Sequence, residues 1–320
     1  MHQISFLSLG LKDKVLKCER FLGEMEQVVP WARICTLIEP YYHPEARTGR
    51  KPFGLELMLR IVCLQQWYHL SDPGVEEAIY DRASFQRFLK IDLLNDAVPD
   101  ETTVLNFRHL LEEHRLMEKV FELVHGHLAG KGLMMKEGTI VDATLIAAAS
   151  STKNQLGKRD PEMSSTCHHG KWHFGLKAAI GVDAKSGLVH RCLVTTAKAH
   201  DNALREQLLH GQEKAVFGDK GFAGDRAKRD ARQKGLYWGV MDQAKRSHPL
   251  SPSQKKRNRQ LRLIRSKVEY PFHVIKCLWG YTKVRYRGLY KNGCQLLLLF
   301  ALANLFRVRK RLLQLQANPI

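Results

Sequence analysis

Acidic residues are nearly missing from the last quarter of this 320-residue chain. After Asp242 the only Asp or Glu is Glu269, and the same 78 positions hold eighteen Lys and Arg, which leaves +17 of the formal net charge of +19 in this segment. Such one-sided charge indicates a polyanionic partner, most simply nucleic acid. A lone carboxylate in this field either makes one structural ion pair or holds a cation against the polyanion.

Three further absences narrow the class of protein. The seven Cys are scattered without a Cys-x-x-Cys pair, which favours a reducing compartment. The N-terminus lacks the basic and apolar regions of a signal peptide. The longest apolar run, Leu296 to Ala303, is shorter than the ~18 residues that a membrane-spanning helix needs. We therefore expect a cytoplasmic protein without a membrane partner.

Residues 1 to about 135 have the pattern of successive helices. Apolar residues recur at helical spacing over 54–70, and a second helix is expected over 75–82. Asp100 is a plausible N-cap for a long helix that continues beyond Leu123. A basic lead-in precedes these helices, formed by Arg47, Arg50 and Lys51. The pattern suits a helix-turn-helix-like DNA reader and, equally well, a helical scaffold for dimerisation.

After Gly138 the pattern changes to strands with interspersed helices. Strands are predicted at 139–146, 172–183, 188–196, 215–218 and 236–241. Helices are predicted at 202–210, with Asp201 as the N-cap, and at 225–234, and the chain ends with long basic helical segments. Residues 147–171 are predicted to form a long loop. This order predicts a mixed β-sheet with helices packed on it.

Three acids stand out as candidate metal ligands. Asp142 lies inside a predicted strand, where Asp is disfavoured and a buried charge needs a partner. Asp219 lies where an apolar strand ends, and Glu269 lies on the basic helix. Each acid alone has an ordinary structural explanation. If the strands are neighbours, the three carboxylates converge, and oxygen ligands select Mg²⁺ or Mn²⁺.

The helix around Glu269 carries basic residues that suit phosphate binding. Steps of four and seven residues place Arg262, Arg265 and Lys276 near the face of Glu269. Arg265 and Glu269 could also form an ordinary i,i+4 ion pair, but several basic side chains around one acid suit phosphate contact better. Pro271 is expected to kink this helix. The basic run before it favours further phosphate contacts and comprises Lys255, Lys256, Arg257 and Arg259.

The segment Arg265-Ser-Lys-Val-Glu269-Tyr-Pro-Phe-His-Val-Ile-Lys276 resembles the R-x3-E-x6-K signature of DDE-type insertion-sequence transposases. Asp142 in Ile-Val-Asp-Ala-Thr and Asp219 in Val-Phe-Gly-Asp-Lys-Gly-Phe resemble the two Asp motifs of that group. The resemblance is closest to the fifth insertion-sequence family and covers nearly the whole chain. One departure is Arg262, because the wider group often has Tyr at that position.

The resemblance implies a ribonuclease-H-like α/β mixed-sheet core at residues 136–290. An all-helical DNA-binding or dimerisation domain would occupy residues 1–135, and a C-terminal basic helix at 291–320 would pack on the core. Asp142, Asp219 and Glu269 would hold two Mg²⁺ ions per active site, with Mn²⁺ as a substitute.

The activity implied by the resemblance is cut-and-paste transposition. DNA strands would be hydrolysed at the ends of the element, and the freed 3′-hydroxyl would then attack target DNA. The partners would be terminal inverted repeats and target DNA, bound by a homodimer associated with the nucleoid. Two alternatives stay open. A transposase-derived DNA-binding regulator needs the basic tail but no metal, whereas a carboxylate-pair glycosidase explains the acids but not the charge.

Overall fold

The fold is described from a computed structural model, which covers residues 15–42, 52–135, 137–154, 157–168, 170–244 and 248–318. Among the helices within these ranges, none combines the length and the apolar character that a membrane crossing requires. The chain divides into two compact units. One contains Met1–Gln65, Leu70–Arg108 and Leu305–Ile320, and the other contains Gln66–His69 and His109–Asn304.

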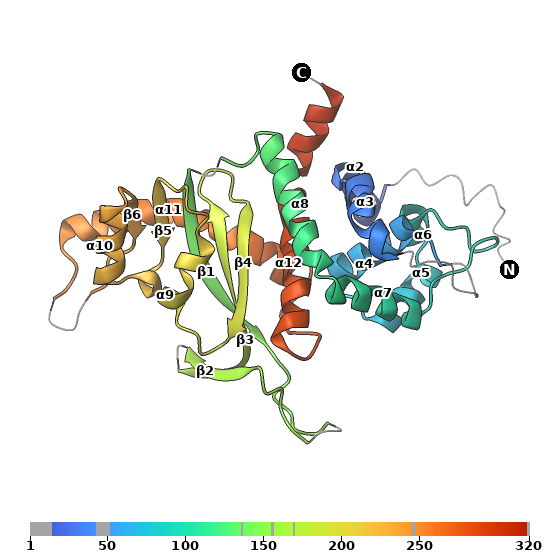
Figure 1. Ribbon diagram of the computed structural model, residues 1–320, viewed down its shortest axis with the longest axis horizontal. Coiled ribbons are helices and arrows are strands. Elements are labelled where there is room, and N and C mark those ends of the chain that lie inside the picture. Colours follow the sequence, from blue (N-terminus) through green and yellow to red (C-terminus); the bar gives the residue numbers. More distant parts are fainter. Residues whose placement is uncertain are drawn as a thin grey trace. The chain divides into compact units, whose positions relative to one another are not determined.

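The first unit is built from helices (Figure 1). The predicted helices at 54–70 and 75–82 are confirmed as α4 and α5, and Asp100 caps α7 by accepting the Thr103 N–H at 2.7 Å. The basic lead-in around Arg47 lies outside the described residues. The helices up to this point are α2 (Lys17–Val28), α3 (Trp31–Tyr42), α4 (Leu55–Tyr68), α5 (Asp72–Asp81), α6 (Ala83–Leu89) and α7 (Glu101–Glu113).

The long helix predicted from Asp100 is two helices instead. α7 ends at Glu113, and α8 spans Leu116–Gly130. Arg115 between them has φ 52°, in the left-handed region that an α-helix cannot include. The apolar pattern contains the reason, since Leu111 and Leu116 are both fully buried but lie five residues apart. That spacing breaks the three-or-four-residue rhythm, so the chain turns to bury both side chains.

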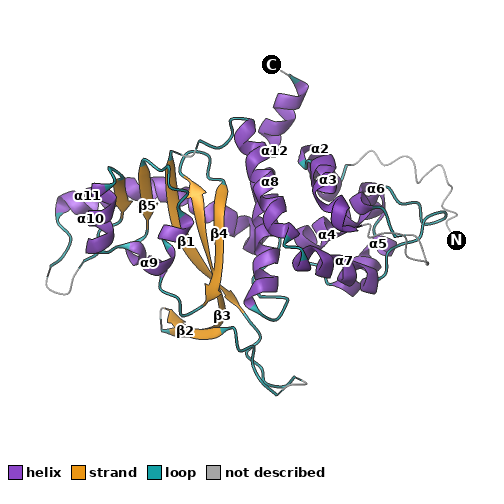
Figure 2. Ribbon diagram, viewed as in Figure 1, coloured by secondary structure: helices purple, strands orange, loops and turns teal. Residues whose placement is uncertain are grey.

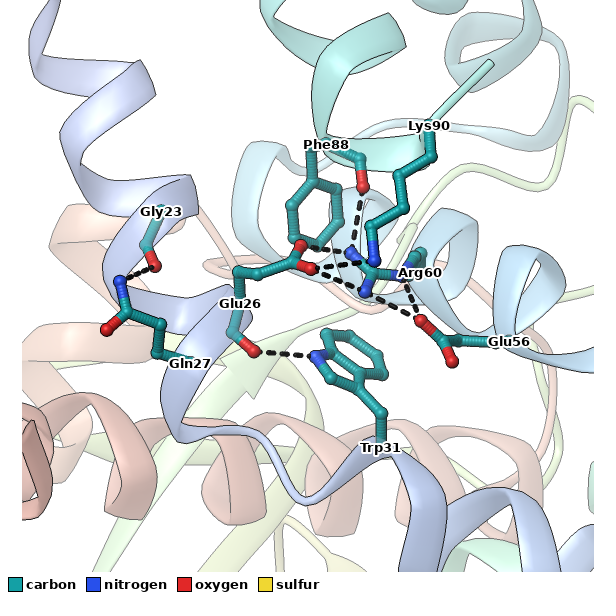
Figure 3. Close-up of polar contacts among 8 residues, drawn as sticks. All are labelled: Gly23, Glu26, Gln27, Trp31, Glu56, Arg60, Phe88 and Lys90. Atoms are coloured by element: carbon teal, nitrogen blue, oxygen red, sulfur yellow. Dashed lines mark hydrogen bonds and ion pairs between the residues drawn. The ribbon is translucent and has the colours of Figure 1, made fainter. Parts of the chain in front are cut away.

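Arg60 on α4 is the centre of a buried polar network in the helical unit (Figure 3). Its guanidinium, 2% exposed, is paired with both Glu26 and Glu56. Its Nη1 also donates to the Phe88 carbonyl at 2.8 Å, and its Nη2 donates to Glu56 Oε1 at 2.7 Å. The group lies 4.6 Å from the Trp31 ring centroid and 5.0 Å from that of Phe88. Every face of this cation is therefore used inside the protein.

The second unit contains a mixed sheet, and its strands are shown as arrows in Figure 2. Within the described residues the strand order is β2-β3-β1-β5-β6, and β4 pairs with β3. β1 is antiparallel to β3 and parallel to β5, and β5 is parallel to β6. The strands are β1 (Gly138–Ala147), β2 (Ser164–His168), β3 (Lys171–Asp183), β4 (Val189–Thr196), β5 (Ala215–Gly218) and β6 (Tyr237–Val240). This is the ribonuclease-H-like arrangement that the sequence predicted.

All five predicted strands are present within one residue of their predicted limits, but β2 was missed. β2 lies in the segment predicted to be a loop and pairs antiparallel with the beginning of β3. Its sequence, Ser-Ser-Thr-Cys-His, has no alternation of apolar residues. The strand therefore depends on pairing with the edge of β3, which no local pattern reveals.

The two faces of the sheet bury different helices. Val141 of β1 packs with a cluster that includes α9 (Asp201–Leu204), the short helix η1 (Glu206–Leu208) and Phe222 of η2 (Lys220–Phe222). The single helix predicted over 202–210 is thus two short pieces, whereas the helix predicted over 225–234 is confirmed as α10 (Asp225–Gln233). On the other face, α11 (Pro252–His273) contacts β1 and β5. Successive strand residues alternate between faces, so Asp142 faces α11.

α11 begins and ends with clear local signals. Ser251 and Gln254 form a capping box, and Pro252 occupies the first turn, where its missing N–H costs nothing. Pro271 lies inside the helix, and three residues later the backbone changes to a π-type turn, η3 (Val274–Leu278). The chain then continues to α12 (Leu289–Ala317). The long α11 is thereby anchored along the strands that carry the two Asp residues.

Candidate active site and DNA interface

Asp142 is a partly buried carboxyl on β1. Its side chain is 22% exposed, and its Oδ1 accepts the Ala143 N–H at 2.9 Å. Burial raises its pKa to about 6, against the lowering effects of Arg265 and of the hydrogen bond from Ala143, while Asp219 and Asp201 raise it further. The charged form of Asp142 is therefore costly unless a cation lies beside it.

Asp219 follows β5 directly and begins η2. β5 is parallel to β1 and pairs Gly218 with Val141, so Asp219 emerges beside Asp142. Its side chain is 42% exposed, and its Oδ1 accepts the Lys220 N–H at 2.7 Å. Two carboxyls from adjacent strands are thus brought to one place, as the sequence pattern predicted.

Arg265 of α11 lies between these two carboxyls. Its Nη2 is 3.7 Å from Asp142 Oδ2, and its Nη1 is 3.6 Å from Asp219 Oδ1. Nη1 also contacts Met241 Sδ at 3.4 Å, and Nε is buried without a hydrogen-bond partner among the residues that the structure describes. Arg265 therefore lies between the aspartates in this structure, and its phosphate contact stays a prediction. A side chain of this length reaches the strands because α11 packs directly on β1 and β5.

Glu269 is not gathered with the other two acids. It lies one turn after Arg265 on α11, and its side chain is exposed. Among the described residues, no group of three or more His, Cys, Asp or Glu is arranged to hold a metal ion. The three-acid metal site therefore stays a prediction, with two of its members brought together and the third one helical turn away.

Lys276 lies on η3 and faces the end of β1. Its Nζ donates to Thr144 Oγ1 at 2.6 Å and to the Leu145 carbonyl at 2.8 Å. Burial lowers the pKa of this ammonium. Thr144 and Leu145 are two and three residues beyond Asp142 on β1. The Lys276 ammonium is therefore a partly buried cation near Asp142 rather than a group on open surface.

An open groove of about 610 Å³ adjoins the acids. Asp219 and Arg265 form one end of it, and Asp242 and Asn258 contribute to its wall. Its lining is otherwise rich in cations, which are Lys220, Lys255, Arg259 and Arg262. Basic side chains along a groove that Asp219 also lines form a surface complementary to a phosphate backbone.

Two members of the predicted basic run do not line this groove. Lys256 is exposed on α11. Arg257 turns toward the sheet, where its Nη1 donates to Asp242 Oδ2 at 2.8 Å and to the Val240 carbonyl at 3.1 Å. Its guanidinium therefore fixes the end of β6 in this structure, and its DNA contact stays a prediction. A run of basic letters cannot reveal which of its members faces inward.

Sequence reasoning missed two polar residues that shape the site. Asn258 is buried on α11 and makes paired hydrogen bonds to the Asp242 backbone at 2.9 and 3.0 Å. Asp201 was interpreted as an N-cap, but His200 occupies that position. Instead, Asp201 accepts a hydrogen bond from Lys177 at 2.7 Å and lies near enough to raise the pKa of Asp142. The only sequence signal was a buried-strand lysine, Lys177, that needed an acidic partner.

Comparison with protein families agrees with this geometry. Residues 134–305 match the family described as Transposase DDE domain, and residues 10–110 match the one described as Transposase domain (DUF772). The first match covers more than half of the chain, so this protein belongs to the DDE transposase family. Members of that family are catalytic transposases that act on DNA and typically use a divalent metal.

Proposed function

We propose that this transposase belongs to the fifth insertion-sequence family and moves its own DNA element by a cut-and-paste route. It would hydrolyse strands at the terminal inverted repeats and join the freed 3′ ends to target DNA. The observation that carries the proposal is the pair Asp142 and Asp219, which face one shared cation, Arg265, and Asp219 and Arg265 also line the basic groove. A non-catalytic DNA-binding protein needs the groove but has no use for a costly buried acid such as Asp142 beside a second carboxyl.

The donor set suits a hard divalent cation. Asp142 and Asp219 offer carboxylate oxygens, and a positive guanidinium already lies between them, so the spot favours positive charge. We propose that Glu269 completes the set after a rearrangement on α11. Bound Mg²⁺ or Mn²⁺, two ions per site, would supply Lewis acidity toward the scissile phosphate. The carboxylates would hold the cation in place, and Asp142 can do so only in its ionised form.

The basic residues would hold the DNA in register. Arg265 can offer two parallel hydrogen bonds to a phosphate once it leaves the aspartates, which a lysine cannot do. Lys276 would contact the strand beside the acids. The groove would take neighbouring phosphates through Lys255, Arg259 and Arg262, and the exposed Lys256 would add a further phosphate contact.

Recognition of the element ends is assigned to the helical region within residues 1–135. The support is a run of short helices with a basic lead-in, separate in sequence from the strands. The full-length Arg47→Ala/Arg50→Ala variant should lose preference for its own terminal repeats over random DNA while keeping cleavage of a pre-nicked end. Unchanged preference would instead assign this region to the homodimer of the synaptic complex.

The decisive experiment for catalysis is incubation of the purified protein with labelled element ends and Mn²⁺. Strand cleavage that EDTA abolishes is expected. Binding of the ends without cleavage, in Mn²⁺ and in Mg²⁺, would favour the alternative of a transposase-derived regulator. An Asp142→Asn variant serves as the matched control, because it should bind the same ends and cut none.

A further inference from the structure

Trp172 is unusually placed for a tryptophan. Its side chain is 76% exposed, whereas Trp31, Trp67 and Trp279 are at most 9% exposed and Trp238 is partly buried. Trp is highly buried on average, and a large exposed aromatic side chain often marks a binding surface. Trp172 lies at the beginning of β3, where β2 and β3 form a hairpin at one end of the sheet (Figure 1).

An aromatic and a cationic group continue the same face of this hairpin. Trp172 and Phe174 are two residues apart on β3, so their side chains share a face. The Arg159 guanidinium lies 5.4 Å from the centroid of the Phe174 ring. Its Nε donates to the Ser150 carbonyl at 2.7 Å, which fixes the planar group on the ring. The hairpin therefore presents Trp172 and then a stacked arginine.

A basic pocket follows directly. The Ala148 N–H donates to the Phe174 carbonyl at 2.8 Å, which joins the hairpin to the segment after β1. A pocket of about 230 Å³ opens there between residues 148–160 and 284–287. Its charged lining is mostly cationic and consists of Lys158, Arg159, Arg285, Arg287 and one acid, Asp160.

The acids next to this pocket are already engaged. Asp160 Oδ2 accepts the Gly288 N–H at 2.7 Å, and Glu162 Oε2 accepts the Leu289 N–H at 2.7 Å. These are amide groups at the start of α12, where a helix favours negative charge. The carboxylates thus serve the helix end, and the pocket keeps a positive field that suits phosphate.

The distance between the basic pocket and the acids can be estimated along β1. Asp142 and Ala147 are five strand steps apart, or ~17 Å at ~3.3 Å per residue. Lys276 contacts β1 between them, at Thr144 and Leu145. Lys276 is therefore a cation on the path from the acids to the pocket.

We propose that the Trp172 strip binds an unpaired DNA strand that leaves the candidate active site. The Trp172 strip is defined as Trp172, Phe174, Lys158, Arg159, Arg285 and Arg287. Trp172 stacks on an unpaired base, and the cations of the pocket hold the phosphates that follow. A single strand is favoured over a duplex because its base faces are available for stacking, and DNA is favoured over a protein partner because the strip is positively charged.

This inference rests on the proposed function for the source of the unpaired strand, so its test measures binding and not cleavage. The full-length protein is titrated, without divalent metal, with a mixed-sequence single strand of about 12 nucleotides, a length within the site sizes of single-strand binders. Tryptophan emission and its quenching by acrylamide are recorded. Trp172 dominates the accessible signal, so the strand should quench its emission and protect it from acrylamide.

Two variants and one control make the test specific. Trp172→Ala should remove the emission change and weaken strand binding by about tenfold, in the range expected for one stacked base. Tyr237→Ala is the control, because Tyr237 is an aromatic residue of β6 that is 54% exposed; this variant should bind like the wild type. Lys158→Ala/Arg287→Ala should flatten the slope of log K against log salt by about 1.4, the value for two phosphate contacts on a single strand.

The outcomes separate this inference from the proposed function. Unchanged affinity and unchanged quenching in Trp172→Ala would overturn the inference, even if the wild type cuts element ends. Altered self-association of Trp172→Ala in sedimentation, with strand affinity intact, would overturn it in favour of a contact between two copies of the chain. If the single strand protects Trp172 from acrylamide in a preparation that cuts no DNA, the binding inference would be supported and the proposed catalysis would be contradicted.

Discussion

Arg60 and Arg265 are both arginines placed between two carboxylates, yet their surroundings differ. Arg60 in the helical unit is 2% exposed, lies between two aromatic rings and makes hydrogen bonds of 2.7–2.9 Å to Glu56, Glu26 and a carbonyl. Arg265 in the sheet unit is 15% exposed and lies 3.6 and 3.7 Å from its aspartates. Its Nε has no hydrogen-bond partner in the described part of the chain.

The difference distinguishes a structural ion cluster from a site that is ready for a ligand. Arg60 is held on every side, and the pKa of Glu26 is lowered mainly by its hydrogen bond to Arg60. Around Arg265, by contrast, the pKa of Asp142 stays raised, to about 6, because the loose contact does not offset burial. A cluster whose charges remain poorly compensated stores free energy that a bound cation or phosphate can release.

Among the substitutions that test this difference, removal of an aspartate should have the largest effect, and it should act on the rate of cleavage. Asp219→Asn should lower single-turnover cleavage of element ends by about 10³-fold, or about 4 kcal/mol of transition-state stabilisation. Binding of the ends should remain, because the groove cations are intact. Filter binding and cleavage assays on the same preparation test this. Cleavage within tenfold of the wild type would remove Asp219 from the site.

Arg60→Ala should mainly affect stability. The change leaves Glu26 and the Phe88 carbonyl without their shared donor and opens space between two rings, so we expect a loss of about 3 kcal/mol in unfolding free energy. Cleavage per folded molecule should hardly change. Urea unfolding followed by circular dichroism measures this loss. Arg20→Ala, an exposed arginine on α2, is the control and should stay within about 0.5 kcal/mol of wild type.

Asp142→Asn should stabilise the metal-free protein in a pH-dependent way. The pKa of Asp142 is raised from 3.8 to about 6, so its stabilising protonated form is fully present below pH ~4 and is lost as pH rises through ~6. The variant avoids this loss and should gain about 3 kcal/mol over wild type at pH 7, with little gain at pH 4. Melting in EDTA across this range, with Asp225→Asn as control, provides the measurement. A gain independent of pH would contradict the assigned cause.

Arg265→Lys should have the smallest of these effects and the most selective one. The substitution keeps the charge but loses the two-pronged hydrogen bonding to phosphate, so cleavage should fall about tenfold, or about 1.4 kcal/mol. Melting temperature should stay near that of the wild type, unlike that of Arg60→Lys, where every donor is used. Parallel melting curves and single-turnover cleavage are required. A large fall in melting temperature with normal cleavage per folded molecule would show that Arg265, like Arg60, has a structural role.

The sequence predicted the sheet well because the relevant information is local. Alternating or continuous apolar residues defined five strands, and Gly218 before Asp219 marked the end of β5. β2 was missed because its polar residues become a strand only by pairing with β3. The break at Arg115 was missed, although the five-residue spacing between the buried Leu111 and Leu116 already departs from the helical repeat.

The candidate site was predictable in composition but not in arrangement. Asp142 and Asp219 were expected to converge only if their strands were neighbours, and β1 and β5 are paired in parallel. The helical face of α11 suggested that Arg265 would accompany Glu269, yet its long side chain reaches the aspartates on the strands below. Likewise, nothing in the basic run distinguished Arg257, which holds β6, from Arg259, which lines the groove. Such choices depend on which partner is within reach in three dimensions.

The central claim is that Glu269 acts with Asp142 and Asp219 in one metal site. The measurement is single-turnover cleavage of labelled element ends in Mn²⁺ by Glu269→Gln, with end binding recorded in parallel. The account predicts binding like the wild type and a cleavage loss as large as that of Asp219→Asn, about 10³-fold. Robust cleavage by Glu269→Gln would contradict a three-acid site and remove Glu269 from the catalytic set.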